Sequence, residues 1–187
     1  MRMLAEQAGV SKKTLYNQYS GKDALVLAAT AEVLENITTQ VASVESGISR
    51  IVAREQAIYE QVMNTPEYAL AMTQALLATS AQNALVEVLI NQSILRTQVE
   101  LGHARKKKEL NEDLDELFLA RSLVSQSWGV LMLWSKGCIP LWQIKSDLMC
   151  AQLNTLVGVS KGAKLVWLKD TRSIYQTTKI SVRETRS

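Results

Sequence analysis

Six polar side chains fall within seven residues near the start of the chain. They are Ser11, Lys12, Lys13, Thr14, Tyr16 and Asn17, and Tyr19 and Lys22 follow closely. Hydroxyl and ammonium groups donate hydrogen bonds, which suits them to phosphate oxygens and to acceptor atoms on the edges of bases. Ordinary surface charge is the alternative explanation for the lysines, and their clustering on one short segment disfavours it. The segment indicates a surface that could bind a polyanion.

Two short helices and a tight corner must position these side chains. Apolar residues recur on one side of residues 2–8, and Gly9 can enter the left-handed region that ends a helix. Ser11 is a good N-cap for the next helix, over residues 12–18. Leu15 faces inward on that second helix, so the polar side chains are left outward. The pattern predicts a helix-turn-helix motif.

The remaining chain also has apolar residues at helical spacing. Helices are expected over residues 23–44, 48–64, 66–78, 81–102 and 112–136, and in a segment that begins at Pro140. Residues 160–187 are polar and basic, and only a short helical turn or strand is expected around "KLVWLK", with the rest mobile. With 8 Gly and 2 Pro, the composition disfavours a β-rich fold. The sequence predicts an all-α fold.

The sequence lacks the residues that several functional classes require. His103 is the single histidine, which excludes a site that needs two. Cys138 and Cys150 match no zinc motif and are interpreted as free, buried thiols in a reducing compartment. No nucleophile elbow, phosphate loop or catalytic carboxylate pair is evident, and "NEDLDE" lacks the glycine bend of a calcium loop. We expect no enzyme, no metal and no cofactor.

The most apolar run, "LFLARSLVSQSWGVLMLW", is interrupted by arginine, serine and glutamine. A membrane-spanning helix needs roughly 20 residues without such groups. The net charge of +3 is uneven, with both ends of the chain positive and the middle negative. We expect a cytoplasmic protein without a membrane partner, whose ends could meet a polyanion.

The run "MLAEQAGVSKKTLYNQYSGKDALVL" at residues 3–27 resembles the DNA-binding segment of TetR/AcrR-family transcriptional regulators. The shared positions are Ala5, Ala8, Gly9, Val10, Ser11, Leu15, Tyr16, Tyr19, Lys22 and Leu25. Tyr19 stands where the family more often has Phe. The second helix of such a motif enters the major groove of double-stranded operator DNA.

The resemblance assigns roles to the polar segment. It implies that Lys13, Thr14 and Asn17 read bases and that Tyr16, Tyr19 and Lys22 hold phosphates. Ser11 and Lys12 are expected on the same DNA-facing surface. Tyr19 could instead be chiefly a core residue.

Members of the family usually have one more helix before the point at which this chain starts. The start codon could lie upstream, the chain could be a fragment, or the helix could have been lost. Whether the chain as given binds DNA is therefore left open at this stage. The alternative is a helical dimeric ligand-binding or interaction protein that no longer binds DNA.

The helices expected over residues 112–136 and after Pro140 are apolar on two faces. A helix with two apolar faces must bury both, which favours a homodimer interface over a deep core. In the family the last two long helices commonly form that interface. The expected interface residues are Leu117, Val124, Leu131, Leu141, Ile144 and Leu148.

The resemblance also implies that the helical domain binds a small-molecule effector, which changes the separation of two DNA-reading heads. The candidate effector contacts are Tyr59, Met63, Gln92, Trp128 and Met132, with plain core packing as the alternative for each. The expected division is a DNA-binding region with its linker helix at 1–44, an effector-binding and dimerisation domain at 45–160 and a basic tail at 161–187. The expected function is a repressor released from its operator by an effector.

Overall fold

The computed structural model describes residues 22–78, 80 and 83–184, and most of them are helical. The elements are α3 (Lys22–Gln40), α4 (Ile48–Asn64), α5 (Pro66–Leu77), α6 (Ala84–Val86), the π-helical turn η1 (Glu87–Asn91), α7 (Gln92–Lys106), α8 (Glu116–Ser135), the 3-10 turn η2 (Leu141–Gln143), α9 (Ile144–Val159) and α10 (Gly162–Glu184). Within these residues the sole β-type pairing is an isolated bridge between Leu110 and Ser160. The predicted all-α fold is confirmed.

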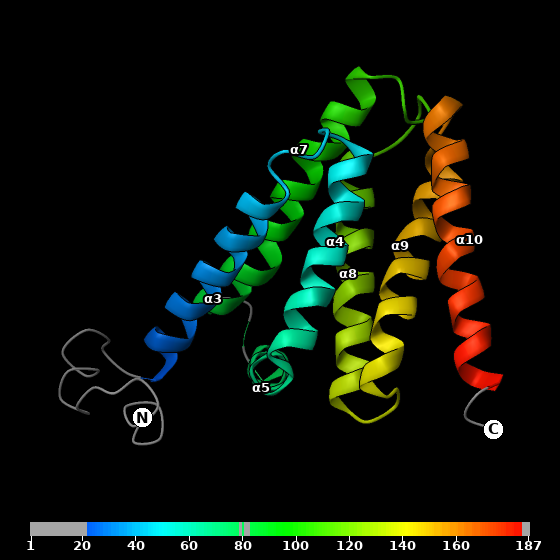
Figure 1. Ribbon diagram of the computed structural model, residues 1–187. Helices are drawn as coiled ribbons and strands as arrows, with labels where there is room; N and C mark the ends of the chain where they lie inside the picture. The colour runs from blue at the N-terminus through cyan, green and yellow to red at the C-terminus, as the bar shows by residue number, and fades with distance from the viewer. Residues whose placement is uncertain (1–21, 79, 81–82, 185–187) are drawn as a thin grey trace.

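The helices form a bundle with α3 at one edge and α10 at the opposite edge (Figure 1). Helix α4 lies inside the bundle and packs against α3, α5, α7 and α9, while α8 packs against α5, α7 and α9. The spacing of buried apolar residues on α4, at Ile48, Ile51, Val52 and Val62, follows the helical period. That stripe explains why residues 48–64 form a helix and which side of it faces the core.

Helix α9 is covered on both faces within the single chain, whereas α8 leaves Phe118, Met132 and Leu133 exposed. Helix α9 packs against α4, α8 and α10, and its Ile144 and Leu148 have no exposed area. Val124 and Leu131 of α8 are also buried. These four residues of the predicted dimer interface are buried within the single chain, so they have little surface to offer a second copy. The deep-core alternative applies to them, whereas Leu117 and Leu141 keep partial exposure.

The C-terminal segment differs from its prediction as a largely mobile tail. Residues Gly162–Glu184 form α10, which packs along α9 and places Leu168 fully in the core. Partly buried positions at Lys164, Leu165 and Tyr175 share this inward side at helical spacing. Lys169 and Ser173 are exposed on the outer side. A narrow apolar stripe within a polar composition is why the helix was missed.

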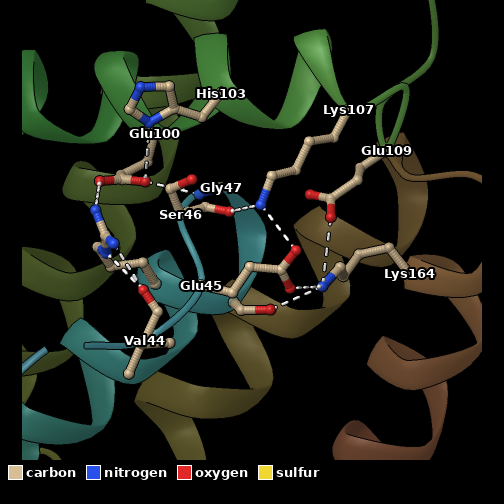
Figure 2. A network of polar contacts seen from close by, with 11 residues as sticks. Val44, Glu45, Ser46, Gly47, Glu100, His103, Lys107, Glu109 and Lys164 are labelled. Atoms are coloured by element: carbon tan, nitrogen blue, oxygen red, sulfur yellow. Dashed lines mark hydrogen bonds and ion pairs between the residues drawn. The ribbon is translucent and has the colours of Figure 1, made fainter. Parts of the chain in front are cut away.

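The turn between α3 and α4 depends on one glycine. Gly47 has φ 97°, a conformation that side chains with a Cβ rarely adopt, and its N–H donates to Glu100 Oε2 over 2.7 Å. Arg50 Nη1 donates to Glu100 Oε1 over 3.2 Å, and Arg50 Nη2 donates to the Val44 carbonyl over 2.7 Å (Figure 2). His103 Nδ1 lies 3.4 Å from Glu100 Oε2. Burial alone would raise the pKa of Glu100, but these donors outweigh it and hold the pKa below its ordinary value.

A second set of contacts ties the same turn to α7 and α10. Lys107 Nζ donates to Glu45 Oε1 over 2.8 Å and to the Ser46 carbonyl over 2.7 Å (Figure 2). Lys164 Nζ lies 3.4 Å from both Glu45 Oε2 and Glu109 Oε1. Glu45 is well exposed, so these pairs contribute less than the buried contacts of Glu100.

Substitution of Glu100 by Ala should destabilise the fold by about 1–3 kcal/mol, because it leaves the Gly47 N–H and the Arg50 guanidinium without their acceptor. The free energy of unfolding from urea titration measures this loss. Lys107→Ala, which removes an exposed partner of the same turn, should cost clearly less. Equal losses for the two variants would contradict the central role assigned to Glu100.

Candidate functional site

The predicted DNA-contacting residues fall at the edge of the described structure. Seven of them, Ser11, Lys12, Lys13, Thr14, Tyr16, Asn17 and Tyr19, lie outside the described residues. Lys22 is the first residue of α3, and its side chain also lies outside them. The structure therefore fixes where the segment joins the bundle, which is at the N-terminal end of α3.

A cavity of about 100 Å³ lies between α3 and the rest of the bundle. Its lining comes from α3, α4, α5, η1, α7 and α8, and most of it is apolar. The lining residues are Thr30, Val33, Leu34, Ile37, Arg54, Glu55, Ile58, Gln61, Val62, Tyr68, Ala69, Met72, Leu89, Ser93, Thr97, Val124, Ser127, Trp128 and Leu131. A concave, mostly apolar space with a few polar groups is typical of a small-molecule site.

Helix α3 forms one wall of this cavity. Val33 and Leu34 line it, and Ile37 does so about one turn further along the helix. Thr30 Oγ1 and Tyr68 Oη form a hydrogen bond of 2.8 Å, which joins α3 to α5 beside the same space. The wall nearest the N-terminal segment is thus held by an apolar surface and by this polar contact.

Glu55 is a carboxyl group on the otherwise apolar side of α4. It is 6% exposed, and its Oε1 has no hydrogen-bond partner among the described residues. Burial raises the pKa of Glu55 to about 7, although the Ser127 hydroxyl and the Arg54 charge oppose the shift. Gln152 Nε2 donates to Ser127 Oγ over 2.9 Å. One oxygen of a buried carboxyl group is therefore left available to a molecule in the cavity.

Arg54, the neighbour of Glu55 in sequence, also lines the cavity. Burial lowers the pKa of Arg54, while the charges of Glu100 and Glu55 favour its protonated form. Its Nε has no hydrogen-bond partner within the described residues. Among the described lining residues Arg54 and Glu55 are the two that carry charge, and their charges are opposite. The wall is therefore neutral when both are ionised.

The structure brings one of the five candidate effector residues to the cavity. Trp128 lines it, whereas Tyr59, Met63, Gln92 and Met132 are absent from the described lining. The Tyr59 ring instead packs under the Lys145 ammonium, 5.2 Å from its centroid.

The other three have different surroundings. Gln92 Nε2 donates to Glu87 Oε1 over 2.9 Å. Met63 and Met132 are each 38% exposed. These placements show that bulk on an apolar helical face is a weak guide to a cavity.

Sequence reasoning missed Glu55, although a signal was present. Ile51, Glu55, Ile58 and Val62 occur at i, i+4, i+7 and i+11, so a carboxylate interrupts the apolar stripe of α4. A buried carboxylate with a displaced pKa is the kind of group that gathers at functional sites.

Two other site classes find no support in the described part of the chain. It contains no group of three or more His, Cys, Asp and Glu side chains that could hold a metal ion. None of its helices is long and apolar enough to cross a membrane. Neither cysteine forms a disulfide within the described residues, and Cys138 is exposed rather than buried as expected.

Glu55→Gln should change how stability depends on pH. The folded protein holds the Glu55 proton more tightly than the unfolded chain, so unfolding releases a proton between about pH 4.5 and about pH 7. Stability contributed by the protonated form is therefore lost as pH rises through this range. The advantage of Glu55→Gln over the wild type should grow by about 3 kcal/mol across it, as measured by urea unfolding at several pH values. Glu32→Gln, at an exposed position on α3, is the matched control, and a constant difference for Glu55→Gln would contradict the assignment.

Comparison with known proteins gives two findings. Residues 1–29 match the family described as bacterial regulatory proteins, tetR family. No curated protein matches the chain in sequence.

Two solved structures share the fold. Both are crystal structures of full-length TylP, a TetR regulator from Streptomyces fradiae, one of them described as native. The first is 19% identical with a TM-score of 0.56, and the native form is 18% identical with a TM-score of 0.55. Each alignment covers 100% of this chain and 81% of TylP. The N-terminal segment is thus similar to that of the tetR family of bacterial regulatory proteins, and the likeness to TylP shows a shared helical fold.

Proposed function

We propose that this protein is a transcriptional repressor that a small-molecule effector releases from its operator. The observation that carries the proposal is the position of α3. This helix follows directly on most of the family-matched segment, and it also forms a wall of the cavity. A ligand that enters the cavity therefore contacts the helix that leads to the DNA-reading residues.

The length of α3 gives such a contact mechanical leverage. Its 19 residues span about 28 Å at the usual helical rise. A ligand beside Val33, Leu34 and Ile37 that tilts α3 displaces its N-terminal end further than the part at the cavity. Because a dimeric regulator reads half-sites about 34–36 Å apart, a small tilt is enough to lose register on DNA.

The proposed partners are double-stranded operator DNA, an effector and a second copy of the chain. Exposed apolar side chains on α8 are the better candidates for the dimer surface than the four buried residues. Phe118 is 69% exposed and Met132 38%, and their spacing of two heptads puts them on the same side of α8. Leu117 and Leu141 stay in the proposed interface. The division at residues 44 and 160 also stays a prediction.

Substitutions in the N-terminal segment test the DNA-reading roles. Lys22→Ala should weaken binding to all DNA sequences. It should also reduce the slope of log affinity against log salt concentration by about the amount of one phosphate contact. Lys13→Ala should in addition reduce selectivity between DNA sequences. Fluorescence anisotropy with DNA from upstream of the protein's own gene, at low and near-physiological salt, measures both effects. Lys169→Ala on the exposed side of α10 removes the same charge and should bind as the wild type does. A folded protein without selective binding would favour the ligand-binding or interaction alternative.

A bulky side chain placed in the cavity tests the coupling to α3. Val33→Trp should fill part of the space from the α3 side and weaken DNA binding about fivefold or more without added ligand, as an effector would. Glu32→Trp, which adds the same ring at an exposed position of α3, should leave affinity unchanged. The measurement is the same anisotropy titration, with thermal unfolding to verify the fold. Unchanged DNA affinity of a folded Val33→Trp variant would contradict the coupling.

A further inference from the structure

The cavity contains an acceptor that the described part of the chain leaves without a donor. Glu55 Oε1 is buried and unpartnered, and Glu55 belongs to the lining. Leaving a buried acceptor unpaired costs free energy, so a molecule that supplies a donor there gains affinity. This unpaired oxygen gives the cavity a preference for molecules with a hydrogen-bond donor, which its apolar walls alone would lack.

The side chains around Glu55 hold its carboxyl group in position. Ser127 faces the carboxyl group and lowers its pKa, and Gln152 Nε2 holds Ser127 Oγ while also donating to the Leu123 carbonyl over 2.7 Å. Gln152 is 2% exposed, so this support comes from the core. The carboxyl group is therefore positioned from the α8 and α9 side.

The charges around the cavity indicate the charge of the molecule it takes. When Glu55 is ionised its charge opposes that of Arg54, and the other described lining residues are uncharged. A cation would gain from Glu55 but be repelled by Arg54, and an anion would meet the reverse. Because an ion also pays for desolvation in an apolar cavity, neither sign is favoured over a neutral molecule.

Building on the proposed function, we infer that the effector is an uncharged, mainly apolar molecule that bears a hydroxyl or amide N–H donor, which binds Glu55 Oε1. The apolar part lies against Val33, Leu34 and Ile37 of α3, and the donor is directed to α4. The volume of about 100 Å³ suits a group on the order of one six-membered ring at this point of the cavity.

Four small probes of similar shape test the inference on the full chain. They are para-fluorophenol, para-fluorotoluene, para-fluorobenzoate and para-fluorobenzylammonium, whose binding is followed by fluorine NMR titration. The phenol and the toluene differ by a hydroxyl in place of a methyl group. In the wild type the toluene should have the larger dissociation constant. The ratio of the toluene constant to the phenol constant should fall about tenfold in Glu55→Met, because the acceptor is gone.

Glu55→Gln is the matched control, because its amide oxygen still accepts a hydrogen bond. The preference for the phenol should stay within about threefold of the wild type in this variant. The retained preference also separates loss of the acceptor from general damage to the cavity. Thermal unfolding of both variants verifies that they are folded.

The outcomes separate this inference from the proposed function. A toluene-to-phenol ratio that is the same in the wild type and Glu55→Met overturns the role of Glu55, yet leaves the cavity as the effector site. Tightest binding of the benzoate or the benzylammonium overturns the uncharged class. Failure of all four probes to bind, with DNA binding intact, overturns the effector cavity and this inference together while the DNA-reading segment stands.

Discussion

The structure depends on the burial of α4. Its apolar stripe is buried against neighbouring helices, and the Glu55 carboxyl group lies in the same stripe. Helices α3, α5, α7 and α9 all pack against α4, so its position sets theirs. The core around Ile48 and Ile51 is tightly closed. Near Glu55 the packing is open enough to leave a cavity. Arg54 and Glu55 place two ionisable groups in that part of the bundle, and both line the cavity.

The sequence predicted the helices well because most of their cores follow a helical period. The expected helix over residues 48–64 is α4 with the same bounds, and Pro66 begins α5 as its fixed φ favours. The family match over residues 1–29 was also anticipated, since the run around Ala8, Gly9 and Ser11 resembles the DNA-binding segment of that family. Periodicity reports on which residues are covered, and for these elements that was sufficient.

The partner of each covered face could not be predicted in the same way. Two apolar faces on α9 indicate two neighbours, and the sequence does not say whether the second is α10 or another chain. The structure places α10 there, with Leu168 in the core. The cavity was not predicted for a related reason. It is the space that remains between several helices, and their packing is not evident from the sequence. Glu55 could have been suspected from its place in the stripe, whereas Thr30 and Tyr68 meet only through the tertiary fold.

The π-helical turn at Glu87–Asn91 bears on how a change in the length of the chain would alter the cavity. Such a turn contains one residue more than an α-helical turn, so side chains after it are rotated by about 100° relative to an uninterrupted helix. Leu89 lies within the turn, and Ser93 and Thr97 follow it, and all three line the cavity. A single-residue deletion there would turn Ser93 and Thr97 away from Leu89 without altering any lining side chain. The cavity can thus acquire a different chemical lining through a change in chain length alone.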